Sequence, residues 1–178
     1  MPHSSKLPSS SRYHVQQVLE ECQPRLRELL QQTSEDWDAD TGLFQVHHGS
    51  WREIRPGIID REAIDWYRYG NCALLALFLH RISGWPLMII SAQKEKGSRM
   101  VHAICQTPNG QLIDIEGTHD PKDELESWRR SFPNAYLERM ASERDFLDIV
   151  GDDFTCYMEH ELALTEDFAY RLYAKYSI

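Results

Sequence analysis

The sequence predicts an α+β fold in which a buried helix packs on an antiparallel sheet, with further helices at both ends. Residues 73–82 are apolar nearly all round, which is typical of a central buried helix. The segments that follow alternate strand-forming runs with polar turns, which indicates a meander of strands. Residues 13–32 and 166–176 carry apolar side chains at three- and four-residue steps, which indicates amphipathic helices near either end.

Length and composition indicate a single domain. The chain has 178 residues, 42% of them hydrophobic and 26% charged, and this is enough to bury a core without metal or disulfide bonds. The Ser- and Pro-rich segment 1–12 predicts a disordered leader before one domain at 13–178. Such a leader also resembles the unstructured export signals of bacterial effectors, so delivery through a specialised secretion system is an alternative to a plain flexible end.

Charge and cysteine usage exclude several classes of partner. A net charge of −9 argues against nucleic acid, and the longest apolar run, residues 72–82, is too short to span a membrane. The four cysteines are scattered without a CxxC motif, which favours a reduced protein in the cytoplasm. The sequence gives no indication of the oligomeric state.

In chain order, the first helix at 13–32 contains Pro24 as a kink or break, and a short strand is expected at 43–47. Asp60 has the position of an N-cap for a helix that extends to residue 68. The buried helix then begins at Cys72, and Gly84 marks its end.

Beyond the buried helix, strands are expected at 87–92, 99–106 and 111–116, with a polar turn at 93–98. The later elements are expected as follows: a helix at 123–130, a helix capped by Ser142, an edge strand at 154–158 and a last helix at 166–176 capped by Thr165.

The turn at 107–111 fixes which side chains share a face of the sheet. Pro108 presets a type I turn, and Gly110 can take the left-handed conformation of a three-residue loop, so Gln106 should face Leu112. Because side chains alternate between faces, His102 and Asp114 then lie diagonally on one face. A two-residue turn would move Asp114 to the opposite face, and Pro108 is the reason to prefer the first register.

Cys72 is placed where a thiol is reactive. The unsatisfied N–H groups of a helix N-terminus stabilise a thiolate and can also donate to an oxyanion. Asn71 either caps this helix or supplies a side-chain donor, and capping is the expected role. With His102 as base and Asp114 as its orienting acid, Cys72 completes the set of groups needed for acyl transfer. Glu116, on the same predicted face, is the second choice for the orienting acid.

The segments GNCALLAL and VHAICQTPNGQLIDIEG together resemble the papain-like superfamily of cysteine hydrolases, in its transglutaminase and NlpC/P60-like branch. The resemblance covers residues 66–117, under a third of the chain. It implies a papain-like core with Cys72 as nucleophile, His102 as general base and acid, and Asp114 as the orienting group. It also implies a protein or peptide substrate and no cofactor.

The sequence departs from the papain pattern at one position. Trp66 stands six residues before the cysteine, where papain-type peptidases carry the glutamine of the oxyanion hole. Oxyanion donors are therefore expected from backbone N–H groups, Asn71 or Tyr69, while Trp66 and Tyr69 are candidates to line a substrate groove. Ubiquitin-directed OTU peptidases share Gly-Asn-Cys but have a histidine near the C-terminus, where this chain has His160.

Hydrolysis of a peptide, isopeptide or amide bond is the favoured reaction. Glutamine deamidation and transglutamination use the same triad and thioester, so they remain alternatives. A papain-like binding or adaptor domain without catalysis is a further alternative, with its acidic surface as the interface. No metal site is expected, because His47, His48, His119 and Cys105 fit no zinc-binding spacing.

Overall fold

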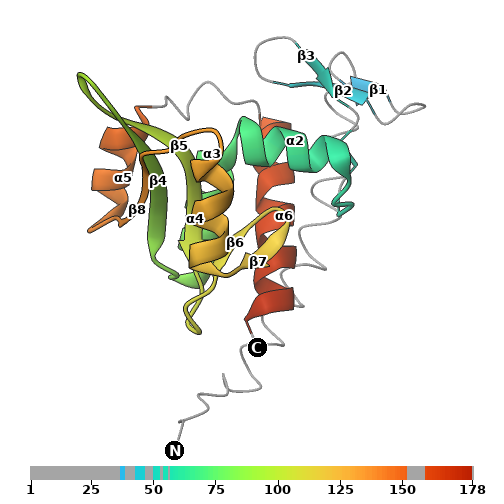
Figure 1. Cartoon of the computed structure of the whole chain (residues 1–178). Coiled ribbons are helices and arrows are strands. Elements are labelled where there is room, and N and C mark those ends of the chain that lie inside the picture. The colour runs from blue at the N-terminus through green and yellow to red at the C-terminus, as the bar shows by residue number, and fades with distance from the viewer. Residues whose placement is uncertain are drawn as a thin grey trace, which may run out of the picture.

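The computed structural model describes residues 54–55, 57–151 and 161–177, together with the backbone of 37–38, 43–46, 50–52 and 159–160. In this part of the chain, five helices accompany a five-stranded antiparallel sheet of order β7-β6-β5-β4-β8, and a three-stranded sheet has order β1-β2-β3 (Figure 1). The elements are β1 (Trp37–Asp38), β2 (Leu43–Val46), β3 (Ser50–Arg52), α2 (Arg61–Tyr69), α3 (Cys72–Ser83), β4 (Leu87–Lys94), β5 (Gly97–Gln106), β6 (Leu112–Asp114), β7 (Gly117–His119), α4 (Pro121–Arg129), β8 (Ala135–Arg139), α5 (Glu143–Val150) and α6 (Glu159–Tyr176). The predicted α+β class is confirmed.

The two helices that lead to the thiol begin where local chemistry predicts. Asp60 caps α2 by accepting a hydrogen bond from the Ala63 N–H at 3.1 Å. α3 begins at Cys72 and ends before Gly84, whose φ of 71° is the left-handed conformation that favours glycine. The Gly84 N–H then donates to the His80 carbonyl at 2.7 Å, which closes the helix.

Replacing Asp60 with alanine is expected to lower the free energy of unfolding by about 1 kcal/mol, because the first turn of α2 loses a capped N–H group. Asp65→Ala in the same helix is the matched control: among the described residues, the interaction of its side chain is an exposed pair with Arg61 at 3.7 Å, so its loss should cost under about 0.5 kcal/mol. Urea denaturation measures both. Equal losses in the two variants would contradict the capping role.

The sheet is covered on both faces, and alternate residues of β4 and β5 face opposite layers. Ala103 and Cys105 face the main core, which is formed largely by α3 and α6. His102 and Ile104 lie on the other face, where α4 packs; this helix lies in front of the sheet in Figure 1. The side chain of His102 and helix α3, which carries Cys72, therefore lie on opposite faces of the sheet.

The predicted register of the β5–β6 hairpin is confirmed. The Thr107 N–H donates to the Gln111 carbonyl at 2.8 Å, and Gly110 closes the turn with φ of 85°. Gln106 pairs with Leu112, as expected from the turn. The proline-containing turn and the alternation of side chains were sufficient to place Asp114 on the face of His102.

Several element boundaries differ from the predictions. The polar turn expected at 93–98 is shorter, because β4 and β5 continue pairing to Lys94 and Gly97. The strand expected at 111–116 ends at Asp114, after which the chain turns into the unpredicted β7. β8 is also unpredicted and pairs with β4 at the edge of the sheet.

Thr165 does not cap the last helix, so that prediction is wrong. It lies inside α6, where its hydroxyl donates to the Glu161 carbonyl at 2.8 Å and lies 3.0 Å from the Tyr67 hydroxyl. The strand predicted at 43–47 corresponds to β2. The leader at 1–12, the helix at 13–32 and the strand at 154–158 lie outside the described residues. Within the described residues, every helix is too short or too polar to cross a bilayer.

Candidate active site

The Cys72 side chain lies at the first position of α3 and is 7% exposed. Asn71 occupies the N-cap position but makes no side-chain capping hydrogen bond, so the expected capping role is wrong. The N–H group of Ala73 interacts with the thiol instead. This N–H belongs to the first turn of α3, so the partial positive charge of the helix N-terminus favours thiolate at the sulfur.

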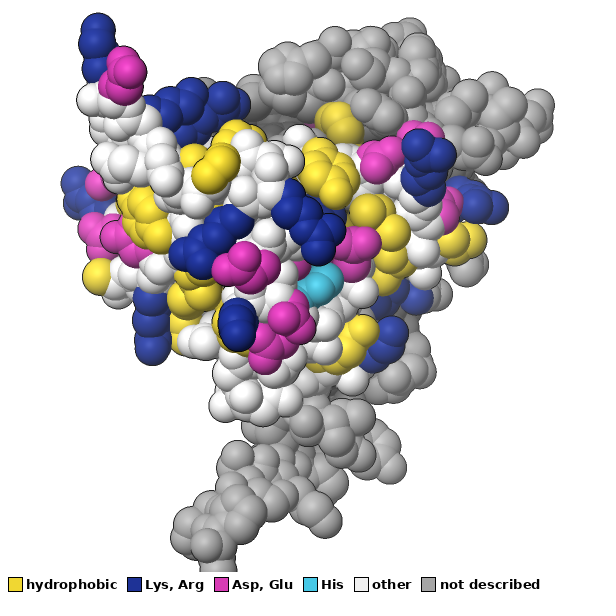
Figure 2. All heavy atoms as spheres, viewed as in Figure 1, with side chains coloured by type: hydrophobic (Ala, Val, Ile, Leu, Met, Phe, Trp, Pro, Cys, Tyr) yellow, Lys and Arg dark blue, Asp and Glu magenta, His cyan; other side chains and the backbone are white. Residues whose placement is uncertain are grey.

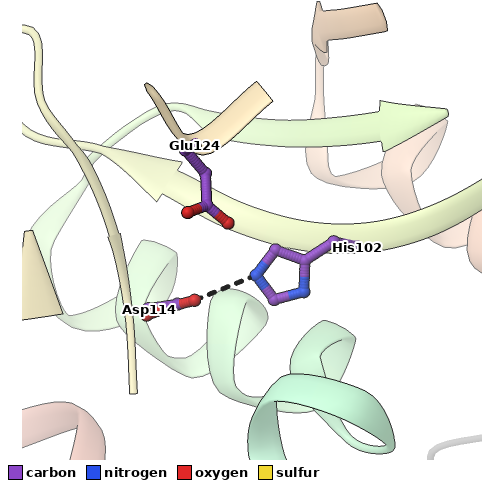
Figure 3. A group of neighbouring side chains, drawn as sticks. All are labelled: His102, Asp114 and Glu124. Carbon is purple, nitrogen blue, oxygen red and sulfur yellow. Dashed lines mark hydrogen bonds and ion pairs between the residues drawn. The ribbon is translucent and has the colours of Figure 1, made fainter. Parts of the chain in front are cut away.

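His102 and Asp114 are in direct contact. The Nε2 atom of His102 on β5 lies 3.1 Å from Oδ2 of Asp114 on β6, and Figure 3 shows the ring edge turned toward the carboxylate. Both side chains are buried, His102 completely. A buried carboxylate at this distance fixes the ring orientation and favours a proton on Nε2.

The end of the β5–β6 pairing lets the thiol reach the histidine. β5 and β6 pair only at Gln106 with Leu112 and at Cys105 with Ile113. Farther along β5, the Ala103 N–H interacts with the Cys72 sulfur. Because the strands separate here, a side chain from the α3 side of the sheet meets a histidine from the α4 side.

The electrostatics of the pair favour thiolate and imidazolium. Burial opposes ionisation of Cys72, but His102 and the N–H groups of Ala103 and Ala73 lower the pKa of the thiol overall. Burial likewise lowers the pKa of His102, whereas Asp114 and Cys72 raise it to about 9. Nδ1 of His102 is buried and has no hydrogen-bond partner among the described residues, while Cys72 is near enough to raise the pKa of the ring, so this nitrogen is available to the sulfur.

The Asp114 carboxylate accepts four hydrogen bonds. Its Oδ2 accepts hydrogen bonds from His102 and Arg68, while Oδ1 accepts from His119 Nε2 at 2.9 Å and from the Glu116 N–H at 2.9 Å. Burial raises the pKa of this carboxyl, but its hydrogen bonds to the two histidines and the charge of Arg68 hold the pKa well below the usual range. Asp114 therefore remains a carboxylate at neutral pH.

Arg68 is the centre of a buried ion-pair network that sequence reasoning missed. Besides Asp114, its guanidinium contacts Glu116 at 2.9 Å and Glu124 at 2.8 Å. These groups come from α2, β6, the turn after β6, and α4. The partial burial of α2 is the one signal that could have drawn attention to Arg68. Sequence spacing gives no other, because its partners Asp114 and Glu124 lie 46 and 56 positions away along the chain.

Trp128 of α4 covers the histidine. Its ring stacks on His102 with centroids 5.0 Å apart and planes 24° from parallel, and its Nε1–H donates to Glu124 at 2.7 Å. Tyr69 lies beside Trp128, 6.1 Å between centroids, and is 69% exposed. The indole keeps water from one face of His102 and strengthens its bond to Asp114. Sequence analysis did not single out Trp128.

The remaining predicted residues have different surroundings. Glu116, expected on the strand face that carries His102, lies instead in the turn after β6 and pairs with Arg68. Trp66 is partly buried against the main core. Tyr69 is the exposed aromatic at the rim of the site. The side chain of His160 and residues His47 and His48 lie outside the described part of the chain.

Two groups of acids and imidazoles in the described residues are close enough to share a cation, and both contain Asp114: His102 with Asp114 and Glu124, and Asp114 with Glu116 and His119. Glu124 points into the same space as the other two side chains in Figure 3. The Arg68 guanidinium already supplies the positive charge to all three acids. The cluster is therefore best described as an ion-pair network.

On the face viewed in Figure 2, a histidine reaches the surface among acidic side chains, with basic side chains nearby. The charges of this surface are therefore mixed rather than of one sign.

No protein-family model matches the chain, and no curated protein or solved structure matches it either.

Proposed function

We propose that this protein is a papain-like acyl-transfer enzyme that hydrolyses a peptide, isopeptide or amide bond of a protein or peptide substrate. Cys72 is the nucleophile, His102 the base and acid, and Asp114 the orienting group. The observation that carries the proposal is the helix-N-terminal thiol paired with a buried imidazole that contacts Asp114 at 3.1 Å. These are the groups that cysteine-based acyl transfer requires.

In this mechanism, the Cys72 sulfur attacks the substrate carbonyl and forms a tetrahedral intermediate. His102, protonated in the ion pair, donates its proton to the departing amine as the carbon–nitrogen bond breaks and a thioester forms. His102 then takes a proton from a water molecule, whose oxygen attacks the thioester. The carbon–sulfur bond breaks, the acid product leaves, and the Cys72 thiolate and protonated His102 form the resting pair again. Asp114 stabilises the imidazolium at each stage and does not itself take the proton.

Oxyanion stabilisation is assigned to the N-terminus of α3. The backbone N–H groups of Cys72 and Ala73 lie at the helix end, where donors are aimed at developing negative charge. The Asn71 side chain is buried beside them and is the side-chain candidate. Tyr69, exposed next to Trp128, is better suited to contact the substrate at the rim.

Deamidation and transglutamination form the same thioester as hydrolysis does. The three reactions differ in the acyl donor and in the acceptor that attacks the thioester. A glutamine side chain as acyl donor with water as acceptor gives deamidation, and an amine as acceptor gives transamidation. Mass analysis of a glutamine-containing peptide after incubation distinguishes all three. Backbone cleavage supports hydrolysis, a gain of one mass unit supports deamidation, and an amine adduct supports transamidation.

A second candidate is a papain-like domain that binds a partner without catalysis. The observation in its favour is the low exposure of the pair: Cys72 is 7% exposed and His102 fully buried. In addition, the cavity of about 360 Å³ between α5 and the β4–β5 hairpin is lined by no member of the triad. A binding role predicts a thiol that is inert rather than activated.

Alkylation separates these two candidates. Cys72 is expected to react with iodoacetamide at pH 6 at least roughly tenfold faster than an ordinary thiol, because its lowered pKa maintains thiolate at that pH. Mass spectrometry of the digested protein follows each cysteine, with glutathione added as the ordinary thiol and Cys105 as the buried control, since burial raises the pKa of its thiol. Equal, slow rates at both cysteines would exclude the enzyme.

A further inference from the structure

His119 is a second imidazole on the proposed orienting acid. It is the last residue of β7, and its Nε2 lies 2.9 Å from Oδ1 of Asp114. Its other nitrogen, Nδ1, lies 3.6 Å from Oε2 of Glu124. The side chain is 22% exposed, unlike the fully buried His102. His119 thus links the buried carboxylate to the protein surface.

The two histidines contact different oxygens of the Asp114 carboxylate. His102 uses Oδ2 at 3.1 Å and His119 uses Oδ1 at 2.9 Å, so Asp114 lies between two imidazole Nε2 atoms. A carboxylate held at one oxygen can rotate about its terminal torsion, which is broad and weakly restricted. Oδ1 has two donors, the Glu116 backbone N–H at 2.9 Å and His119 Nε2 at 2.9 Å, and His119 is the side-chain donor of the two. Together they restrain this rotation, and His119 thereby helps to fix the direction of the lone pair that faces His102.

The backbone around His119 is itself constrained. β7 pairs with β6 so that His119 lies opposite Leu112, and the strand starts at Gly117 with φ of 113°. A side chain at Gly117 would collide with Tyr176 of α6, so glycine allows α6 to pack closely on this strand. The position of His119 is thus set by the pairing with β6 and by the packing of α6. The hydrogen bonds described above do not join either contact to the thiol.

We propose that His119 is a positioning residue for the reaction, which holds Asp114 through Oδ1 so that Oδ2 orients His102 toward the Cys72 sulfur. The inference rests on the proposed function, because it assigns His119 a role in that triad. Arg68 contributes to the same carboxylate but also neutralises Glu116 and Glu124, so its removal changes much more than the orientation. His119 is the residue at which orientation can be tested separately.

Three substitutions distinguish a donor at the Nε2 position from a general polar or structural effect. His119→Gln places an amide nitrogen at the reach of Nε2, His119→Asn places one only at the reach of Nδ1, and His119→Ala has no donor. The readout is the rate of Cys72 alkylation by iodoacetamide as a function of pH, with thermal melting to verify the fold. His80→Gln is the control, since His80 lies in the last turn of α3, and the hydrogen bond described for its side chain is to the carbonyl of Trp85, beyond the helix.

Relative to wild type at pH 6, the alanine and asparagine variants should react roughly tenfold more slowly, because a small misplacement of a catalytic group reduces rates by such factors. The acid limb of their pH profiles should move to higher pH. The glutamine variant should stay within about threefold of wild type. Equal rates in all variants, or an equal loss in the glutamine and asparagine variants, would overturn the positioning role.

The outcome for the wild type separates this inference from the proposed function. A wild-type thiol that is unreactive at pH 6 contradicts the enzyme itself. A reactive wild-type thiol whose rate is unaffected by His119→Asn contradicts only the role of His119. If His119→Ala does not fold, the comparison of the glutamine and asparagine variants still decides the question.

Discussion

Replacing His102 with alanine is expected to reduce acyl transfer by at least about a hundredfold, because general acid–base catalysis typically contributes that much or more. The histidine both maintains Cys72 as thiolate and returns a proton to the leaving group. Cleavage of a peptide or amide substrate, whose leaving amine needs a proton, measures both roles, and release of p-nitrophenolate from p-nitrophenyl acetate measures the loss of thiolate alone. Cys72→Ser should lose a comparable amount, since a hydroxyl beside His102 is a poorer nucleophile than a thiolate.

The pH dependence of the wild type follows from the two shifted pKa values. Activity rises as pH passes the lowered pKa of Cys72, because the thiolate forms there. It falls above about pH 9, where His102 loses the proton that it donates to the leaving group. A substrate with an amine leaving group is needed to see the alkaline limb, because p-nitrophenolate leaves without a proton.

His80→Ala is the matched control for the loss of a histidine and should keep activity within about twofold of wild type. His80 lies in the last turn of α3, and its Nδ1 contacts the Trp85 carbonyl at 2.8 Å. An activity in His102→Ala close to that of the control would contradict the assignment of the base.

Replacing Arg68 with alanine is expected to lower the free energy of unfolding by about 3–5 kcal/mol, the usual cost of removing one partner from a buried ion pair. The side chain is only 8% exposed, and its loss leaves Asp114 and Glu124, each 3% exposed, without their main cation. Urea denaturation at neutral pH measures the change. Arg68→Lys should recover only part of it, because an ammonium lacks the fork that reaches several acids.

The penalty should also depend on pH. In the wild type, the pKa of Asp114 is depressed in the folded protein, so the carboxylate contributes stability above its unfolded pKa of about 3.9. That stability is lost as pH falls through the folded pKa. The difference between wild type and Arg68→Ala should therefore decrease in acid, where the carboxylate no longer needs the cation.

Arg81→Ala is the matched control, because Arg81 pairs with Glu143 at 2.7 Å with both side chains at least one-third exposed. Its removal should cost less than about 1 kcal/mol, the usual range for surface pairs. If Arg68→Ala were no more destabilised than this control, the buried network would contribute little to stability.

The sequence determined the local parts of this fold. Pro108 and Gly110 set the hairpin register that places Asp114 beside His102, because turn chemistry and the alternation of side chains act over a few residues. Gly84 and the apolar run before it likewise determined the extent of α3. Local signals failed at Thr165, because a threonine inside a helix can satisfy its hydroxyl on the preceding turn and then resembles a cap.

The tertiary structure alone decided what surrounds the histidine and the acid. Arg68, Glu124 and Trp128 come from α2 and α4, and these helices meet at the site only when α2 packs on α3 and α4 packs on the sheet. Their contacts join residues far apart in the chain, for which periodicity and spacing carry no information. The reason is physical: a local pattern selects the conformation and exposed face of one element, whereas the partner of a buried charge is selected by how whole elements pack together.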